Sequence, residues 1–323
     1  MFSTGSMFFL RTLTHTRVGS AAGEDGLDLP LCRDAQGQTY LPFSAVRGAV
    51  RQQVQERQEE WTQRSFGEGG HRSSLLSFTD QKLLLWPAAA DFRCWLTSRE
   101  ALSEVHRLAE KLGAGSLPPL PSGTVPEALV SGASGKWVAG EETLRVTCAP
   151  EIAAWEAWLG ACCGLQLAGK VAVVSAARLQ TFSSRTSQIA SRLRLQEESR
   201  TAAKGAFWYE EYLPEDTVFA GGVLAMEPRL YDAQTGETAA QLLEKLGAAL
   251  AEPMPIGAAT SRGGGMVQGT LGSPAAQQPR GTNPSAKDSS AEPVQSGASQ
   301  KDTAAKSDAW QRKQKQKQKH KKK

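Results

Sequence analysis

The chain has 323 residues, with 37 Lys and Arg against 33 Asp and Glu, and hydrophobic residues make up 40% of it. This length fits one large domain or two small ones, and the apolar content suffices for a sizeable core. No apolar run approaches the roughly 20 residues that span a bilayer, and the N-terminal residues lack the features of a signal peptide, so we expect a cytoplasmic protein without a membrane segment.

The charge is unevenly distributed along the chain. Residues 261–323 carry 13 Lys and Arg against 4 Asp and Glu, whereas residues 1–260 carry 24 against 29. A nucleic acid would therefore have to bind the slightly acidic body through a local basic groove and not through bulk charge. Five cysteines at irregular spacing, including the adjacent Cys162 and Cys163, favour reduced thiols over disulfides or a zinc site.

The first half of the chain predicts short strands and helices with long connections. In chain order, the patterns predict strands over residues 7–10, 75–86 and 92–96, and helices over residues 44–63 and 99–112. Ser44 is the expected N-cap of the earlier helix and Ser98 that of the later one, and Pro87 is expected to end the strand before it. Residues 21–40 predict a Gly- and Asp-rich loop, and residues 113–140 an insertion or long loop.

The second half continues this alternation and then changes character. It predicts helices over residues 152–164 and 239–250 and strands over residues 170–175, 207–213 and 217–226. Residues 178–206 hold six basic residues against two acids. Residues 273–323 have low complexity, end in a Lys-rich run and are expected to be a disordered tail, which either holds RNA electrostatically or is simply solvated. Strands and helices without regular βαβ units favour an α+β, ferredoxin-like (RRM-like) core over residues 1–272 with long insertions.

Common catalytic motifs are missing from the sequence, including phosphate-binding Gly-rich loops, dinucleotide fingerprints, nucleophile elbows and paired CxxC motifs. A more informative pattern lies near the helix predicted from Ser44. Arg47 and Arg51 are four positions apart and follow a helix N-terminus whose free N–H groups suit phosphates. Arginines at this spacing are also common on ordinary helix surfaces.

The ordered motifs along the chain resemble the RAMP superfamily of CRISPR proteins. The segment Leu41–Gly48 is similar to the family's Ile-Pro-Gly-Ser-Ser-Leu-Lys-Gly run, with Phe43, Ala45 and Arg47 as departures. Further matches follow the same order, and these are Gly19-Ser20, Asp28-Leu29-Pro30, Ser65-Phe66-Gly67, the run from Phe78 to Pro87 with Trp95-Leu96-Thr97, the run from Tyr209 to Thr217, and the Gly-rich stretch from Ile256 to Gly269. The type III-B (Cmr) backbone subunit is the branch that these matches resemble most.

The resemblance implies an RNA-binding backbone subunit of a type III effector complex. Its implied partners are CRISPR guide RNA, target RNA, other RAMP subunits, a large effector subunit and further copies of itself along the guide. It implies that Asp28 is required to cut target RNA, with His15, Asp80 and Glu211 as weaker candidates. A thumb-like hairpin is expected within residues 178–206. The residues expected to contact RNA are Gly19, Ser20, Ser44, Arg47, Gly48, Arg51, Arg185, Arg192 and Arg194.

RNA cleavage needs little from the protein, because the 2′-OH of the RNA is itself the nucleophile and the main requirement is in-line geometry. A carboxylate such as Asp28 could accept the 2′-OH proton or hold Mg²⁺ or another divalent cation, which usually keeps several waters. Each candidate also has an ordinary structural interpretation. Asp28 could be a turn former, His15 and Asp80 could be packing residues, and either Glu210 or Glu211 could face the RNA.

Two alternatives to a cleaving subunit remain open at this point. The departures at Phe43 and Ala45, the 113–140 segment and the basic tail also suit a structural RNA-binding subunit of a related III-A or III-D complex that does not cut. A stand-alone RNA-processing endonuclease of the same superfamily is the third possibility. It predicts that the isolated chain cleaves repeat RNA without partners.

Overall fold

A large mixed sheet forms the centre of the protein in a computed structural model, which describes residues 2–19, 27–57, 61, 65–67, 73–88, 92–122, 127–196, 202–228 and 237–272. All of these residues belong to one unit, Met1–Gln278. The predicted tail over residues 273–323 and Ser20 lie outside the described residues.

The strands of the sheet are not in chain order, so distant segments lie side by side. Their spatial order is β13 (Met254–Pro255), β14 (Met266–Leu271), β1 (Phe2–Thr12), β12 (Val218–Met226), β4 (Gln81–Ala88), β5 (Cys94–Ser98), β9 (Val171–Val174), β6 (Ala128–Val130), β8 (Glu142–Cys148) and β7 (Gly135–Ala139). Two short strands pair off this path, β2 (Tyr40–Leu41) with β4 and β3 (Leu76–Phe78) with β12. The β1 register places Phe8 opposite Gly221 on one side and Leu271 on the other, both antiparallel.

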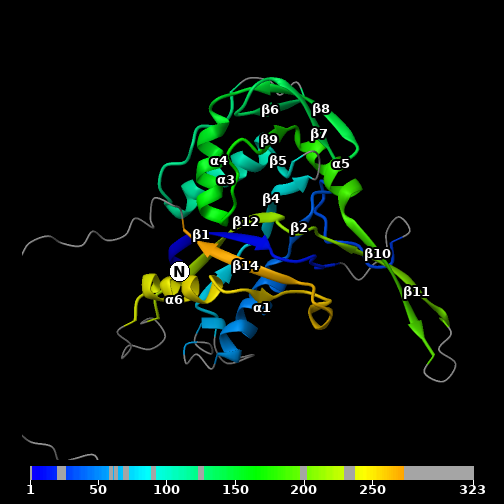
Figure 1. The fold of residues 1–323 in the computed structure, drawn as a ribbon. Coiled ribbons are helices and arrows are strands. Elements are labelled where there is room, and N and C mark those ends of the chain that lie inside the picture. Colours follow the sequence, from blue (N-terminus) through cyan, green and yellow to red (C-terminus); the bar gives the residue numbers. More distant parts are fainter. Residues whose placement is uncertain are drawn as a thin grey trace, which may run out of the picture. The chain divides into compact units, whose positions relative to one another are not determined.

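Helices cover both faces of the sheet (Figure 1). On one face lie α1 (Phe43–Glu56) and α6 (Ala239–Leu250), and on the other lie α3 (Arg99–Leu112) and α4 (Ile152–Cys163). β1 is buried between them, because Phe8 and Leu10 join the core under α1 and α6 whereas Met7 and Phe9 join the core under α3 and α4. This double burial explains the continuous apolar run over residues 7–10, where a strand with one wet face would alternate.

Local signals fix several helix ends. Ser98 accepts a hydrogen bond from the Ala101 amide and caps α3, as the sequence predicts, and Gly113 ends that helix in the left-handed conformation. α6 begins with a capping box between Thr238 and Gln241 and has the bounds expected from its Leu and Ala pattern.

Two sequence expectations about local structure are wrong. Ser44 does not cap α1, because the helix begins one residue earlier, after Pro42, which makes no side-chain cap. The strand predicted over residues 75–86 is divided into β3 and β4, and Pro87 lies within β4 at the pair with Trp95. The 113–140 segment, expected to be an insertion or long loop, contains β6 and β7, which extend the sheet.

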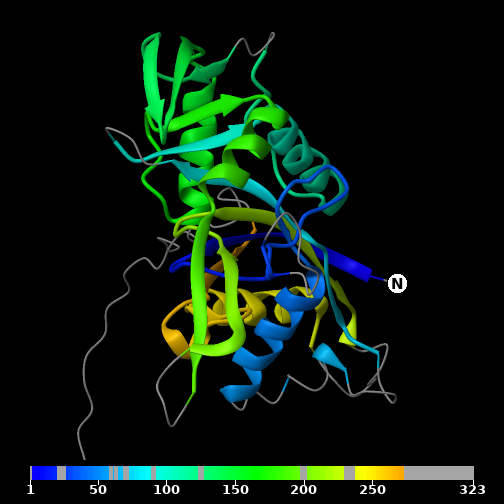
Figure 2. The same cartoon turned by 90° about the vertical axis from the view of Figure 1, so that its right-hand side faces the viewer.

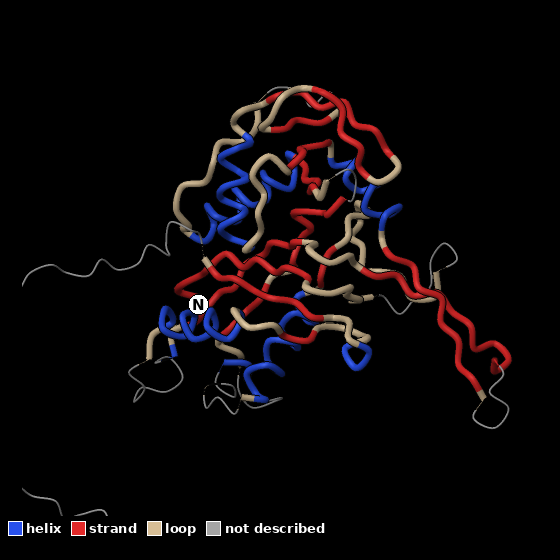
Figure 3. Tube along the Cα trace, in the orientation of Figure 1, coloured by secondary structure: helices blue, strands red, loops and turns tan. Residues whose placement is uncertain are grey.

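A separate two-stranded hairpin follows α5 (Ala176–Thr186). It consists of β10 (Gln188–Leu195) and β11 (Ala202–Tyr212) and projects from the body of the protein in Figures 1 and 3. Beside its base runs a Gly-rich loop, defined here as residues 257–265, which contains the short 3-10 turn η2 (Thr260–Arg262). Within the described ranges, no helix is long and apolar enough to cross a membrane.

Candidate nucleic-acid interface

The chain segment that follows β1 runs between the hairpin and the Gly-rich loop. Thr16 and Leu213 exchange backbone hydrogen bonds of 3.1 and 2.8 Å at the hairpin base. On the other side, amides of the Gly-rich loop donate to the carbonyl oxygens of His15 (2.8 Å) and Arg17 (3.0 Å). Gly257 permits this approach, because its φ is +72° and a Cβ there would lie 2.1 Å from the Arg17 carbonyl oxygen.

The half-buried side chain of His15 packs into this junction. Its ring meets the ring of Tyr212 edge-to-face, with centroids 5.2 Å apart. A Cβ on Gly264 would lie 2.8 Å from its Nε2 atom, so the Gly-rich loop closes over the imidazole. His15 therefore contacts the base of the hairpin, as an interface residue would, but none of these contacts joins it to Asp28.

Asp28 is exposed and lies beside β11 at the base of the hairpin. Its Oδ2 atom accepts a hydrogen bond of 2.8 Å from the backbone amide of Tyr209. The next residue, Leu29, forms a parallel bridge with Glu210, through its amide to Tyr209 O (3.2 Å) and its carbonyl from the Glu211 amide (3.1 Å). No local sequence pattern predicts this pairing, because its two sides are 181 positions apart.

Gly19 also packs against the segment that follows Asp28. Gly19 forms an antiparallel bridge with Leu31, and a Cβ on Gly19 would lie 2.6 Å from the Pro30 carbonyl oxygen. The predicted contact residue Gly19 is thus needed for close backbone packing.

Glu211 is buried and bonded to the loop that carries Asp28, with Ser187 at the end of α5 as a further partner. The Arg33 guanidinium donates to both carboxylate oxygens, at 3.0 and 2.5 Å, and the Leu31 amide donates to Oε2 at 2.9 Å. Burial raises the pKa of Glu211, but the bonds from Arg33 and Leu31 outweigh it and hold the pKa below its ordinary value. The side chain is 1% exposed, so it anchors the loop and is closed to a bound strand.

Glu210 points to the other face of β11 and is the centre of a second polar cluster. Trp208 Nε1 donates to it at 2.9 Å, Arg192 Nε at 3.3 Å and the Tyr212 hydroxyl as well, while the Arg262 guanidinium lies 3.5 Å away. Burial acts to raise the pKa of Glu210, but the hydrogen bonds from Tyr212, Trp208 and Arg192 lower it to about 2. The sequence left open which of Glu210 and Glu211 faces the RNA. Neither side chain is exposed, since both are buried and paired with arginines.

The N-terminal part of α1 presents a polar stripe to solvent. Ser44, Gly48 and Arg51 are exposed at helical spacing, and nothing lies within 4 Å of a Cβ built on Gly48. Arg47 turns away from this stripe, donates to the Phe66 carbonyl at 2.5 Å and lies over the Phe66 ring. Arg47 therefore fixes the short Phe-Gly loop to the helix.

Asp80 lies at the start of the same helix. Its Oδ1 atom accepts a 2.8 Å hydrogen bond from the Phe43 amide, the first of α1. Asp80 therefore takes the capping position that the sequence assigned to Ser44. This contact is structural and leaves Asp80 apart from the cluster around β11.

The two faces of the hairpin differ in chemistry. Cross-strand pairs put Ile189, Leu193, Phe207 and Tyr209 on one face, where they are 60%, 51%, 54% and 39% exposed. Phe207 and Tyr209 meet edge-to-face at 5.0 Å. Large apolar side chains this exposed are the mark of a contact surface. Figure 2 shows the hairpin turned toward the viewer.

Of the arginines predicted to contact RNA in this region, one bonds to other protein side chains and two are exposed to solvent. Arg192 is occupied by Glu210 and by the Tyr212 hydroxyl at 3.1 Å. Arg194 is exposed on the same strand, and Arg185 in α5 is 72% exposed with Glu142 3.6 Å away. Arg185 and Arg194 therefore offer charge that a phosphate backbone could use.

The candidate divalent metal would have few protein ligands here. Among the residues that the structure describes, no group of three or more His, Cys, Asp or Glu side chains could hold a metal ion. Asp28 keeps one carboxylate oxygen outside the Tyr209 hydrogen bond. A single oxygen of this kind fits a hydrated Mg²⁺ that takes its other ligands from water and phosphate.

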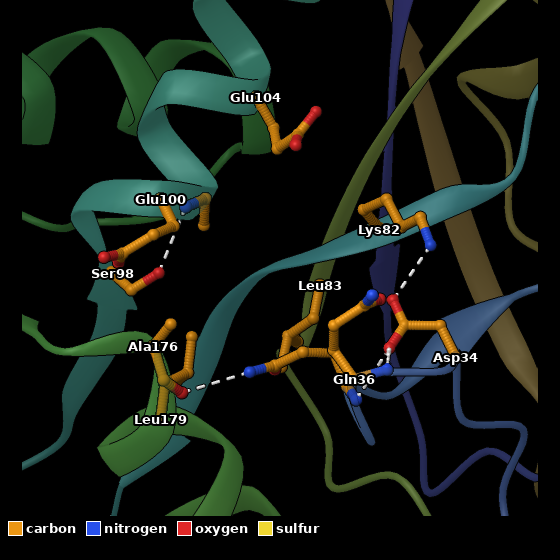
Figure 4. Close-up of a pocket in the computed structure, with 11 residues that line it drawn as sticks. Asp34, Gln36, Lys82, Leu83, Ser98, Glu100, Glu104, Ala176 and Leu179 are labelled. Atoms are coloured by element: carbon orange, nitrogen blue, oxygen red, sulfur yellow. Dashed lines mark hydrogen bonds and ion pairs between the residues drawn. The ribbon is translucent and has the colours of Figure 1, made fainter.

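A cleft of about 450 Å³ lies further along the same loop and is shown in Figure 4. It lies between the turn at Asp34 and the starts of α3 and α5. Asp34 pairs with Lys82 at 3.0 Å, and Gln38 donates to the Ala176 carbonyl at 3.0 Å. These bonds tie the far end of the Asp28 loop to β4 and α5. The remaining charged side chains of the cleft, Glu100 and Glu104, are acidic and unsuited to phosphate.

Solved structures share this fold. A chain of the type III-B Cmr-beta complex bound to cognate target RNA, solved by cryo-EM, gives a TM-score of 0.67 at 16% identity, over 84% of this chain and 98% of that one. Oligomeric Cmr4 from Pyrococcus furiosus, solved by crystallography, gives 0.65 at 20% identity, over 84% and 100%. The mixed α+β fold expected from the sequence is thus confirmed.

Sequence comparison points the same way. The chain is 25% identical over 282 residues to the CRISPR system Cmr endoribonuclease Cmr4 of Pyrococcus furiosus, a match that covers 81% of this chain and 94% of that protein. The family model of the RAMP superfamily matches residues 9–268. This match takes in the Asp28 loop, the helix α1, the hairpin and the Gly-rich loop, and the chain belongs to the RAMP superfamily.

Proposed function

We propose that the chain is the guide-RNA-binding backbone subunit of a type III-B CRISPR effector complex and that it cuts bound target RNA through Asp28. The observation that carries the proposal is the exposed Asp28 carboxylate, oriented by the Tyr209 amide at the base of a hairpin with an exposed apolar face. The relative in Pyrococcus furiosus that bears the name endoribonuclease supports the enzymatic half.

The fold supports a backbone role in more detail. The strand order β14-β1-β12-β3, all antiparallel, with α1 after β1 and α6 after β12, supports the ferredoxin-like core. In this role the chain binds guide RNA, target RNA, other RAMP subunits, a large effector subunit and further copies of itself. A cytoplasmic location follows from the role.

Two surfaces are suited to hold RNA. The α1 stripe of Ser44, Gly48 and Arg51 combines a helix N-terminus with an exposed cation and, at Gly48, room for a backbone to approach. On the hairpin, exposed apolar and aromatic side chains such as Phe207 can wedge between bases, and Arg194 can meet phosphate. The hairpin thus takes the thumb-like role that the resemblance implies.

The chemistry uses the 2′-OH of the target strand as the nucleophile. Displacing a base bends the strand toward in-line geometry, and Asp28 at the foot of the hairpin accepts the 2′-OH proton or holds the cation. A hydrated Mg²⁺ bound there would neutralise charge that develops on the phosphate. The Tyr209 amide occupies Oδ2 and so leaves Oδ1 as the reactive oxygen.

One observation favours a second candidate function. The carboxylates of Glu210 and Glu211 are both occupied by arginines, which leaves Asp28 without an acidic partner from β11 among the described residues. A structural subunit of a III-A or III-D relative that binds RNA and leaves cutting to another chain would tolerate this arrangement.

The test assembles the complex with guide RNA, partner subunits and Mg²⁺ and offers complementary RNA. Asp28→Asn keeps an acceptor for the Tyr209 amide and removes the charge, and the matched control is Glu141→Gln, an exposed acid in the β7–β8 turn. We expect regularly spaced cuts from the wild type and the control, and a loss of about 100-fold or more for Asp28→Asn. Equal cutting by Asp28→Asn would remove Asp28 as the catalyst, and bound but uncut target with the wild type would favour the structural subunit.

A further inference from the structure

The loop that carries Asp28 is joined to the hairpin by one parallel β-bridge and by side-chain bonds. Its contacts with β11 come from four positions between Asp28 and Arg33, through the Asp28 carboxylate, the Leu29 backbone, the Leu31 amide and the Arg33 guanidinium. All of them end on β11 residues 209–211. The catalytic candidate and the exposed hairpin are therefore bonded directly to each other.

Tyr209 couples the two parts directly. Its amide orients Asp28, its carbonyl accepts from Leu29, and its side chain lies on the exposed apolar face of the hairpin. The position of the carboxylate relative to a base displaced by the hairpin therefore depends on the register between loop and strand. A slip of one residue would move every side chain of the loop to the other face.

The ion pair between Arg33 and Glu211 is what prevents such a slip. The pair is bidentate and Glu211 also accepts from Leu31, so among the described residues the only cation bonded to this 1% exposed anion comes from the loop, while Ser187 at the end of α5 is a neutral partner outside it. Any other register would take Arg33 and Leu31 away from this buried charge, which is strongly unfavourable. The backbone bonds of Leu29 alone do not select a register, because any residue can make them.

The far end of the loop and the base of the hairpin are held by other contacts, independently of this ion pair. Asp34 pairs with Lys82, and Thr16 bridges Leu213 at the hairpin base. Breaking the Arg33–Glu211 pair should thus loosen the segment of residues 28–33 without releasing the loop or the hairpin as a whole.

We propose that Arg33 and Glu211 are positioning residues whose ion pair holds Asp28 in register with the hairpin, and so sets which phosphodiester of a bound target strand is cut. This inference rests on the proposed function for the cutting step. It also gives Glu211 a role that differs from proton transfer, since its carboxylate is buried.

The first measurement maps cut positions at nucleotide resolution in the assembled complex with Glu211→Gln and Arg33→Ala. The matched control is Arg11→Ala, because Arg11 is 24% exposed where Arg33 is 22%, and it pairs with the buried Asp216 away from the loop. We expect the rate at the main site to fall about 100-fold for both loop variants, with new cuts at neighbouring phosphodiesters, and the control to keep the wild-type pattern. A pattern of cuts unchanged by Glu211→Gln and Arg33→Ala would overturn the proposal.

The second measurement is hydrogen exchange over residues 27–34 in the same complexes. We expect exchange about 10-fold faster or more in Glu211→Gln and wild-type exchange in Arg11→Ala. Unchanged exchange in Glu211→Gln would overturn the positioning role even if target RNA is never cut. If the wild type binds target without cutting it, the proposed enzymatic function fails, while faster exchange still supports the coupling of the loop to the hairpin.

Discussion

Replacing Glu210 by Gln should destabilise the protein by an amount that depends on pH. The carboxylate has a pKa of about 2 in the folded chain against an ordinary value of 4.5, because Tyr212, Trp208 and Arg192 donate to its charged form. Each unit of difference corresponds to about 1.4 kcal/mol, so the ionised form contributes about 3 kcal/mol to the free energy of unfolding at neutral pH. A folded pKa below the unfolded one gives stability that is present above pH 4.5 and is lost as the pH falls toward 2.

Urea denaturation of the full-length chain at a series of pH values would measure this contribution. The wild type should exceed Glu210→Gln by about 3 kcal/mol at pH 7 and by about half of that near pH 3. Glu141→Gln, which changes an exposed acid, should stay near the wild type throughout. A gap between wild type and Glu210→Gln that is constant with pH, or absent at pH 7, would refute the account of the cluster.

Further predictions concern a helix cap, two glycines and the thiols. Asp80→Ala should lower the free energy of unfolding by about 1 kcal/mol and leave the pattern of target cuts unchanged; loss of cutting at unchanged stability would make Asp80 catalytic. Gly257→Ala should lower the melting temperature more than Gly169→Ala. Both glycines have positive φ, but only a Cβ at position 257 would lie 2.1 Å from a backbone atom, the Arg17 carbonyl oxygen; equal shifts in melting temperature would contradict this. The exposed Cys148 should react with a thiol reagent at pH 8 well before Cys94, because burial raises the pKa of Cys94 to about 11, and a fast phase that survives Cys148→Ser would count against it.

Elements with local signals were predictable from the sequence, and elements defined by distant partners were not. The helix α6 and the Ser98 cap of α3 follow from side chains within a few positions of each other. The cap of α1 does not, because Asp80 reaches the Phe43 amide from 37 positions away. Reasoning from neighbouring residues alone assigned the N-cap to Ser44, because a serine lies near the predicted start of the helix.

The same division holds at the candidate site. Asp28 and the glycines could be named because they belong to ordered motifs of the family. The partners Arg33 and Arg262 were missed, since they meet Glu211 and Glu210 only through the tertiary fold, in the first case across 178 positions. The burial of those two acids could not be predicted either, because two adjacent glutamates in a strand usually put one side chain into solvent.

The position of β1 has a consequence for synthesis of the chain on the ribosome. Phe8 pairs with Gly221 and with Leu271, so β1 has neither neighbour until the ribosome has completed almost all of the described chain. Translation proceeds at about 5–20 residues per second, so this apolar strand, which is buried on both faces in the folded protein, stays unpaired for on the order of tens of seconds. Nascent chains of this protein are therefore expected to depend on holding chaperones during translation, and β1 can gain its second neighbour only after β14 has left the ribosome.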